Sequence, residues 1–139
     1  IIDLWNTEDM DKMALPPCHF LSQFYVEDGY LDVKFSMRSV DVGLGLPFDI
    51  AFYALMSEII CEITGLAPRA LVVDLTNVHI YTNHVEALTE MVERDCKTLP
   101  GIFLPEMESL DYLDTFTAKD FNLHNYNPHP AVKLPLSVG

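Results

Sequence analysis

The stretch that decides the fold is Met37-Arg-Ser-Val-Asp-Val-Gly-Leu-Gly-Leu-Pro-Phe-Asp-Ile-Ala-Phe-Tyr53, in which a strand-like run, a glycine-rich turn and a helix start follow one another. Its two glycines free the backbone for the turn, and Pro47 suits the first turn of a helix. Apolar residues continue at helical spacing up to Gly65, a helix stop signal, so the sequence predicts a helix from Pro47 to Thr64. This helix is apolar on most faces, and we therefore expect it to be buried inside the fold.

The residues before this stretch predict a β-hairpin. Cys18 to Glu27 is rich in aromatic and apolar residues, Asp28-Gly29 is a hairpin turn signal, and Tyr30 to Val42 alternates. After the helix, Arg69 to Tyr81 has the composition of a central strand. This order favours an α+β fold, with residues 1–139 as a single domain on one mixed sheet. Shorter elements are expected in four places: a strand at residues 1–5, a helix at Thr7–Met13 capped by Thr7, a helix from Asn83 to about Cys96 opened by a capping box with Glu86, and a short helix at Ser109–Phe116.

The composition excludes several classes of function. Eight Lys and Arg against 21 Asp and Glu give a net charge of −13, which repels polyphosphate, so no nucleic acid polymer is expected as a partner. A small anionic metabolite is compatible with this charge where local cations outweigh it. No apolar run is long enough to span a membrane, so we expect a cytoplasmic protein, in the host cytoplasm if the source is viral. Three cysteines without Cys-x-x-Cys spacing indicate free thiols, and no cluster of metal ligands is visible.

A few positions carry side chains suited to chemistry. Cys18 follows two prolines that fix the backbone ahead of it, and a cysteine acts as a nucleophile only as a thiolate, which needs a nearby cation. Arg38 lies on the partner strand of the predicted hairpin, so it can supply that cation. A buried, inert cysteine is the alternative interpretation. His79 and Tyr81 share one face of the predicted central strand, either as solvated side chains or as hydrogen-bonding groups aimed at a ligand.

Four motifs, taken together in their order and spacing, resemble the thymidylate synthase family over nearly the whole chain. They are Leu15-Pro-Pro-Cys18-His19, Arg38-Ser39-x-Asp41-x-Gly-Leu-Gly-Leu-Pro-Phe48, His79-Ile-Tyr81-x-Asn83-His84 and Tyr126-Asn-Pro-His129-Pro130. The resemblance is to the carboxyl-terminal half of the family. It implies a thymidylate synthase-like mixed sheet with a buried central helix, incomplete without the amino-terminal half. It also implies transfer of a one-carbon unit from 5,10-methylenetetrahydrofolate to C5 of a pyrimidine deoxynucleoside monophosphate.

The resemblance also implies roles for the matching side chains in the nucleotide site. Cys18 would add to C6 of the pyrimidine, which makes C5 nucleophilic and splits one difficult step into two. Arg38 and Ser39 would hold the 5′-phosphate, and His19 is placed among the nucleotide-binding residues. The positions that match the groups bonding the 3′-hydroxyl of the deoxyribose are His79 and Tyr81.

A second set of matching residues would face the folate. It comprises Asp41 and the turn that follows, with Leu44, Gly45 and Phe48 as the expected folate-binding residues. In the family the last residues fold over the folate as a lid. This chain ends Leu136-Ser137-Val138-Gly139, one residue beyond the usual aliphatic terminus.

The most informative departure from the family pattern is Asp49. Thymidylate synthases have asparagine here, whose amide reads N3-H and O4 of uracil, whereas an ionised aspartate only accepts hydrogen bonds and suits the 4-amino group of cytosine. A proton shared between Asp49 and N3 would draw electrons from C6, so we assign Asp49 to catalysis as well as to base choice. The same substitution is seen in phage deoxycytidylate hydroxymethylases of this family. It predicts conversion of dCMP to 5-hydroxymethyl-dCMP.

Two further departures agree with a cytosine site. Phe52 stands where the family usually has a small serine, and Thr76-Asn77-Val78 lacks the aspartate that normally lies near the nucleotide. Three alternatives stay open. They are a thymidylate synthase acting on dUMP, an enzyme that methylates dCMP at C5, and a non-catalytic remnant that binds nucleotide or serves in dimerisation.

The amino-terminal half of the family pattern has no counterpart in these residues. Family members carry there a glutamate that relays protons, tryptophans that touch folate, and an arginine pair that reaches the phosphate of the other subunit. We therefore expect these 139 residues to belong to a longer polypeptide, or a separate chain to supply the rest. The family also leads us to expect a homodimer.

Overall fold

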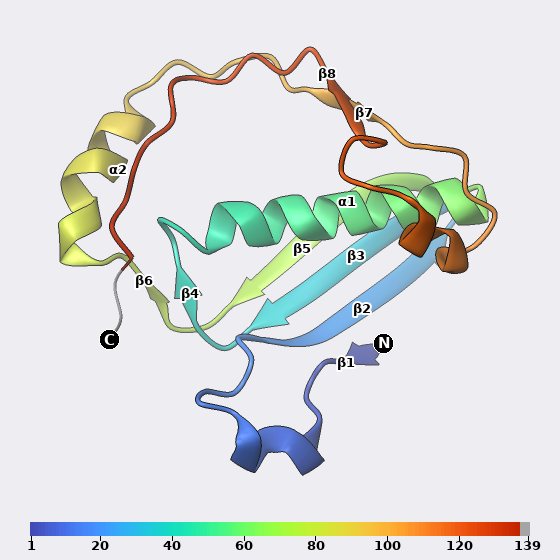
Figure 1. Ribbon diagram of the computed structural model, residues 1–139, viewed down its shortest axis with the longest axis horizontal. Helices are drawn as coiled ribbons and strands as arrows, with labels where there is room; N and C mark the ends of the chain where they lie inside the picture. The colour runs from blue at the N-terminus through green and yellow to red at the C-terminus, as the bar shows by residue number, and fades with distance from the viewer. Residues whose placement is uncertain (137–139) are drawn as a thin grey trace.

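The computed structural model describes residues 1–136 and shows one long helix lying across a twisted sheet (Figure 1). The predicted hairpin is confirmed, with β2 (His19–Glu27) antiparallel to β3 (Tyr30–Met37). Asp28 and Gly29 form its turn with φ angles of 51° and 81°. These left-handed values are what a tight two-residue hairpin turn requires, which explains the Asp-Gly pair.

Two more strands complete a four-stranded mixed sheet in the order β1-β2-β3-β5. β1 (Ile2–Asp3) is shorter than the expected strand at residues 1–5, and β5 (Ala67–Leu75) runs parallel to β3. The crossover from β3 to β5 includes α1 (Leu46–Thr64), and the expected α+β fold is confirmed. The prediction of a central strand after the helix is wrong for residues 1–136, because β5 lies at the edge of the sheet there.

α1 follows its sequence signals closely. Gly45 is its N-cap residue, Pro47 lies in its first turn, and Gly65 ends it with a left-handed φ of 70°. On its sheet-facing side the ring of Tyr53 stacks on that of Phe35, with centroids 3.9 Å apart and planes 8° apart. The buried core under the helix forms two clusters, one of Phe35, Met37, Val40 and Tyr53 and the other of Leu31, Val33 and Cys61.

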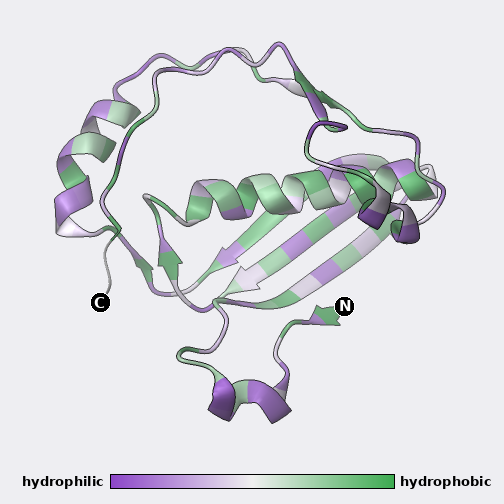
Figure 2. Cartoon of the chain, viewed as in Figure 1, coloured by the Kyte–Doolittle hydropathy of each residue, from purple (hydrophilic) through white to green (hydrophobic). Residues whose placement is uncertain are grey.

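The outer side of α1 differs from the expectation of burial on most faces. Phe48 and Phe52 are 74% and 62% exposed in this chain, although the sheet-facing side is covered. Figure 2 shows the helix as largely apolar, and the strands beside it as alternating bands of apolar and polar residues. Alternation is the pattern of strands with one covered face, and it agrees with the two core clusters between sheet and helix.

Two of the predicted strands are interrupted near their carboxyl-terminal ends. β5 ends at Leu75, and Asn77 adopts a left-handed φ of 47° before the short β6 (Val78–His79). β3 likewise ends at Met37, and the chain resumes as β4 (Val40–Asp41), which pairs in parallel with β6. This small second sheet extends the carboxyl ends of β3 and β5, the place where parallel strands present ligand-binding loops.

Two short helical segments differ from prediction in their caps. η1 (Thr7–Lys12) is a 3-10 helix capped by Asn6 rather than Thr7, because the Asn6 side chain accepts from the Glu8 amide. η2 (Thr82–His84) precedes α2 (Val85–Val92), so the predicted capping box at Asn83 is wrong and the helix ends before Cys96.

The rest of the chain arches over the helix with little regular structure (Figure 1). β7 (Gly101–Phe103) pairs with β8 (Asn122–His124), and η3 (Leu110–Thr115) lies within the short helix predicted there. The expected lid includes residues 137–139, which lie outside the described part of the chain. Within residues 1–136 no helix is long and apolar enough to cross a bilayer. The same residues contain no group of three metal-binding side chains.

Candidate active site

Cys18 and Arg38 meet at the open end of the hairpin. The Arg38 amide donates to the Cys18 carbonyl oxygen at 2.9 Å. The Arg38 guanidinium turns back over the prolines, where Nε donates to the Pro17 carbonyl oxygen at 3.2 Å and Nη2 donates to that of Pro16. The indole Nε1 of Trp5 also donates to Pro17, at 3.1 Å. The segment ahead of the half-buried Cys18 is therefore held by three hydrogen bonds from Arg38 and Trp5.

A β-bulge determines which way His19 points. The pairing of β2 with β3 shifts between His19 and Leu21, so Phe20 is an extra residue in its strand. Because side chains alternate along a strand, the extra residue turns His19 to the face covered by α1. There its ring packs beside Phe35 and Tyr53, with centroids 6.3 and 5.5 Å away.

His19 connects Asp49 to Tyr53. Its Nε2 lies 3.2 Å from Oδ1 of Asp49, and its Nδ1 lies 3.2 Å from the Tyr53 hydroxyl oxygen. An ionised carboxylate only accepts, so Nε2 carries the proton and donates to Asp49, while the tyrosine donates to Nδ1. The Asp49 side chain is 21% exposed at the start of α1, and a carboxylate keeps acceptor capacity at its second oxygen for a ligand.

Asn77 connects Ser39 to His79. Its Nδ2 donates to Ser39 Oγ at 3.1 Å, and its main-chain oxygen accepts from His79 Nδ1 at 2.9 Å and from the Val40 amide at 3.3 Å. Tyr81 lies beyond the end of β6, so the shared strand face is wrong, yet the His79 and Tyr81 rings still meet edge to face at 5.3 Å. Of the residues that the resemblance assigns to phosphate and sugar, Ser39 and His79 are thus both bonded to Asn77.

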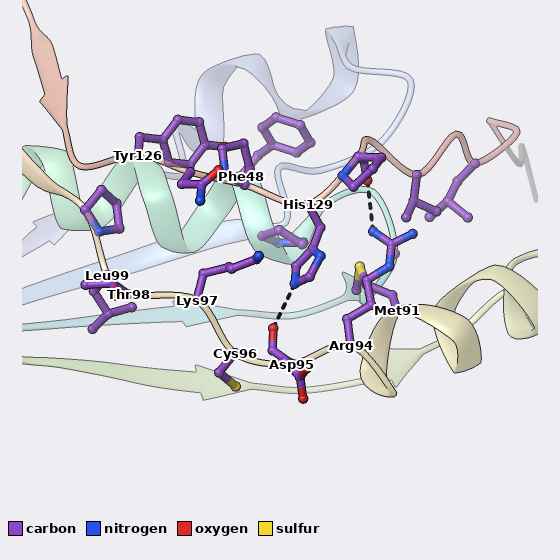
Figure 3. A pocket seen from close by; sticks show the side chains of 18 of the residues that line it. Phe48, Met91, Arg94, Asp95, Cys96, Lys97, Thr98, Leu99, Tyr126 and His129 are labelled. Atoms are coloured by element: carbon purple, nitrogen blue, oxygen red, sulfur yellow. Dashed lines mark hydrogen bonds between the residues drawn. The ribbon is translucent and has the colours of Figure 1, made fainter.

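An open pocket of about 750 Å³ lies beside the glycine-rich turn (Figure 3). Of the four residues expected at the folate, Leu44 and Phe48 line this pocket, whereas Asp41 and Gly45 lie outside its lining. Asp41 instead holds the turn, because its Oδ1 accepts from the Gly43 amide at 2.9 Å and its carbonyl oxygen accepts from the Gly45 amide at 3.1 Å. The Asp41 side chain remains 23% exposed.

The opposite wall of the pocket comes from the carboxyl-terminal third of the chain. Figure 3 shows Tyr126 near Phe48, with Lys97, Arg94 and His129 farther along the pocket. Arg94 is fixed there, since it donates to the Pro130 carbonyl oxygen at 2.9 Å and to Glu90 at 3.1 Å. The pocket therefore places aromatic rings and cations together in a chain whose net charge is −13.

Sequence reasoning missed the part that Tyr53 plays in this site. Its spacing was the available signal, because Tyr53 lies four residues after Asp49 and such pairs share one helix face. Cys61 is buried in the core, as expected, and burial raises the pKa of its thiol, with a smaller contribution from Glu58. A raised pKa favours the unreactive thiol, so Cys61 is unsuited to nucleophilic chemistry.

Comparison with known proteins identifies the family. The family model described as thymidylate synthase matches residues 1–138, and the chain belongs to the thymidylate synthase family. It is 48% identical to the probable thymidylate synthase of Escherichia phage T5 over 99% of this chain. It is 47% identical to the thymidylate synthase of Herpesvirus ateles over 96% of the chain, and 42% identical to that of Homo sapiens over 99%.

The same comparisons show how much of each relative the chain covers. The chain covers 50%, 46% and 44% of these three relatives, so it spans about half the length of the curated relatives it matches. Thymidylate synthases use 5,10-methylenetetrahydrofolate as their one-carbon donor. All three relatives bear the name thymidylate synthase, and the resemblance to deoxycytidylate hydroxymethylases stays a prediction from Asp49.

Proposed function

We propose that this chain is the catalytic carboxyl-terminal part of an enzyme that transfers a one-carbon unit to C5 of a pyrimidine deoxynucleoside monophosphate. The rigid corner in which Arg38 holds Cys18 supports this most directly. The Cys18 thiolate adds to C6, and the electron pair of the C5–C6 double bond moves to C5, which becomes the nucleophile. 5,10-Methylenetetrahydrofolate, when bound, supplies the one-carbon unit. Arg38 and Ser39 bind the 5′-phosphate, and His79 and Tyr81 bind the 3′-hydroxyl.

We further propose that the base is cytosine. The observation that carries this is the 3.2 Å contact in which His19 donates to Oδ1 of Asp49. With Oδ1 oriented in this way, Oδ2 can accept from the 4-amino group of cytosine, and a proton at N3 completes the pairing. Uracil presents O4 at the same place, where it would face a second acceptor. A hydrogen bond to a charged group contributes about 1.5–3 kcal/mol, enough to separate the two bases.

The proposed product is 5-hydroxymethyl-dCMP. Water that attacks the methylene group left on C5 gives the hydroxymethyl product, whereas hydride delivered from the folate gives a methyl group. Phe52 stands where the family usually has a small serine. Its ring is exposed, and it directly precedes Tyr53 in the sequence. We propose that its ring helps to decide between water and hydride. Methylation of dCMP is the nearest alternative to this product.

The pocket beside the glycine-rich turn fits the folate. A folate combines flat rings with glutamate carboxylates, and the pocket offers the rings of Phe48 and Tyr126 together with the cations Lys97 and Arg94. We propose Leu44 and Phe48, which line the pocket, as direct folate-binding residues, and Gly45 as a folate-binding residue of the turn beside the lining. Asp41 shapes the same site through the turn that it holds, and its exposed fraction leaves it within reach of the ligand.

A thymidylate synthase acting on dUMP is the second candidate. The names of the three relatives favour it, and the contacts of Arg38, Ser39, His79 and Tyr81 suit either base. A non-catalytic nucleotide-binding remnant is the third. The ordered corner around Cys18 is what speaks for an enzyme instead.

We propose that the site is completed by the amino-terminal half of the family fold, from the same or another chain, within a cytoplasmic homodimer. The edge position of β5 supports this, because an edge strand presents unpaired main-chain groups to any strand that can join it. The exposed rings of Phe48 and Phe52 also offer apolar surface to such a partner.

Trapping of the covalent adduct tests the function. The complete polypeptide, or the chain combined with the amino-terminal half, is incubated with methylenetetrahydrofolate and either 5-fluoro-dCMP or 5-fluoro-dUMP, and its intact mass is measured. Fluorine at C5 blocks loss of the C5 substituent, so an active enzyme retains both ligands on Cys18. We expect an adduct with the cytosine analogue that is absent in Cys18→Ala and present in Cys96→Ala, which removes an exposed thiol. An adduct with the uracil analogue alone would establish a thymidylate synthase acting on dUMP. No adduct with either analogue would leave the non-catalytic remnant.

A further inference from the structure

His84 is a buried side chain to which neither the sequence nor the site described so far gives a part. It is fully buried and joins three segments that are distant in the sequence. Its Nε2 donates to the carbonyl oxygen of Pro135 at 2.7 Å, which fixes the carboxyl-terminal segment to η2. Its Nδ1 faces the glycine-rich turn, 3.8 Å from Oδ1 of Asp41.

The turn packs directly against this imidazole. A methyl group added at Gly43 would lie 2.8 Å from Nδ1 of His84 and 3.0 Å from Cδ1 of Leu134. Both Gly43 and Leu134 line the pocket assigned above to the folate. His84 therefore lies immediately behind that part of the pocket wall where the turn and the carboxyl-terminal segment meet.

The Nδ1 atom of His84 lacks a hydrogen bond among residues 1–136. A separation of 3.8 Å is too long for a hydrogen bond, although it is close enough for attraction between charges. Since Nε2 donates to Pro135, a neutral ring presents a lone pair at Nδ1 to the Asp41 carboxylate, and both groups are acceptors. A proton on Nδ1 turns this opposition into attraction, and a small approach of the two groups from 3.8 Å would then form a charge-assisted hydrogen bond.

We infer that His84 is a positioning residue that couples the carboxyl-terminal segment to the folate-facing turn by taking up a proton. In its protonated form it donates to Asp41 and to Pro135 together, so turn and tail are held as one wall. In its neutral form it holds only the tail. Binding of a ligand that needs the joined wall is then linked to proton uptake, and becomes tighter as the pH falls.

The groups around His84 are consistent with this coupling. From β4 it meets the Asp41 carboxylate, and from the loop before η2 it meets the Tyr81 ring, edge-on at 5.5 Å. From the tail it meets the Pro135 carbonyl oxygen, which does not titrate. A purely structural histidine would make the same packing contacts, but its protonation would not change the positions of both Gly43 and Leu134.

An NMR titration tests the coupling without any need for activity. In the polypeptide that carries this chain, the Gly43 amide and the Leu134 methyl signals should shift together with the His84 ring as the pH is lowered. His84→Gln should abolish both shifts. His124→Gln, which removes a histidine of β8 next to Phe103, is the matched control and should leave them unchanged. Absence of the shifts in the unsubstituted protein, or their persistence in His84→Gln, would overturn the inference.

A second variant covers the case in which His84→Gln does not fold. Asp41→Asn removes the carboxylate charge and keeps an oxygen for the Gly43 amide. It should greatly reduce the shift at Gly43 and preserve the shift at Leu134, because the bond to Pro135 remains. Equal shifts at Gly43 in Asp41→Asn and in the unsubstituted protein would show that protonated His84 does not act on the turn through Asp41.

A kinetic arm rests on the proposed function. The KM for methylenetetrahydrofolate should decrease as the pH is lowered in the unsubstituted enzyme. In His84→Gln it should be about fivefold higher, as loss of one hydrogen bond predicts, and should lose this pH dependence. The KM for the nucleotide should not change. Equal effects on both KM values would indicate general distortion and overturn the coupling. If no adduct forms but the NMR shifts are seen, the proposed function fails and the coupling stands.

Discussion

Nε2 of His19 lies 3.2 Å from Oδ1 of Asp49, so the residue next to the candidate nucleophile is bonded to the residue that departs most from the family pattern. The contact spans 30 positions in the chain and depends on the bulge at Phe20. It joins the residues proposed for attack at C6 and for choice of base in one structural unit, so single substitutions can test both roles.

Asp49→Asn should exchange the base preference. The amide donates to O4 of uracil and no longer offers two acceptors to cytosine, and a charge-assisted hydrogen bond of about 1.5–3 kcal/mol corresponds to roughly 10- to 100-fold in the ratio of rates. The measurement is the rate of adduct formation with 5-fluoro-dCMP and with 5-fluoro-dUMP. Glu58→Gln, which neutralises a carboxylate farther along α1, should leave the ratio unchanged. An unaltered ratio in Asp49→Asn would mean that another residue reads the base.

Tyr53→Phe should weaken the site without emptying the core. The ring still stacks on Phe35, but the hydroxyl that donates to His19 Nδ1 is lost, so His19 keeps only its hydrogen bond to Asp49 and is oriented less firmly. We expect the free energy of unfolding to fall by about 0.5–1.5 kcal/mol and the adduct rate to fall about tenfold. Tyr25→Phe, which removes an exposed hydroxyl bonded to Glu27, is the control and should change neither value. A normal adduct rate in Tyr53→Phe would separate the tyrosine from the chemistry.

Phe35→Ala should destabilise the fold severely. Phe35 is completely buried against Tyr53, and removal of such a ring costs about 3–5 kcal/mol. That is a large share of the roughly 5–15 kcal/mol by which domains are stable. Urea unfolding followed by circular dichroism measures the loss. Phe103→Ala, at an exposed ring stacked on His124, should cost much less, and similar losses in the two variants would show that the helix does not depend on the Phe35 stack.

Arg69→Gln should change how stability depends on pH. Arg69 donates to both oxygens of Asp32, from Nε at 2.9 Å and from Nη2 at 2.6 Å, and these hydrogen bonds hold the pKa of Asp32 below its ordinary value of 3.8. The unfolded chain therefore binds this proton more readily than the folded one. The contribution of the pair is present above about pH 4 and is lost as the pH falls through the lowered folded-state pKa.

Thermal unfolding of both proteins measured between about pH 2 and 7 checks the Arg69 prediction. The variant should have a lower Tm at neutral pH and a shallower fall of Tm in acid, and added salt should reduce the difference because the pair is partly exposed. Lys12→Gln removes the exposed pair with Asp9 and should follow the curve of the unsubstituted protein. Parallel curves for Arg69→Gln and the unsubstituted protein would contradict the assignment.

Local chemistry in the sequence predicted much of this structure. Asp28, Gly29 and Gly65 were predicted to form a turn and a helix end, and all three adopt the left-handed backbone that these features need. Arg38 was expected near Cys18 because hairpin pairing brings the strand ends together, and the structure shows that contact. These features depend on neighbours in the chain or on a single pairing rule, so a sequence can report them.

Features that depend on tertiary context escaped prediction. The bulge at Phe20 and the break at Asn77 each change the direction of the side chains that follow, and an apolar strand pattern contains no mark of either. β5 reads as a central strand because its composition reflects burial, while its edge position reflects which other strands are present. The link from His84 to Pro135 spans 51 positions and leaves no local pattern.

The hairpin turn at Asp28 and Gly29 fixes which residues of β2 and β3 face each other at the far end of the sheet, where His19 lies. It sets the phase of β2 against β3, and the bulge at Phe20 adds one residue to the count. An insertion of one residue between the bulge and Arg38 that stays within a strand would exchange the two faces and carry His19 away from Asp49. An insertion that loops out at the tip would leave the count intact. Within a strand, a change of one residue should therefore be tolerated less well than a change of two, which restores the faces. Changes at the tip of the turn should be tolerated best, although none of these changes alters a side chain of the site.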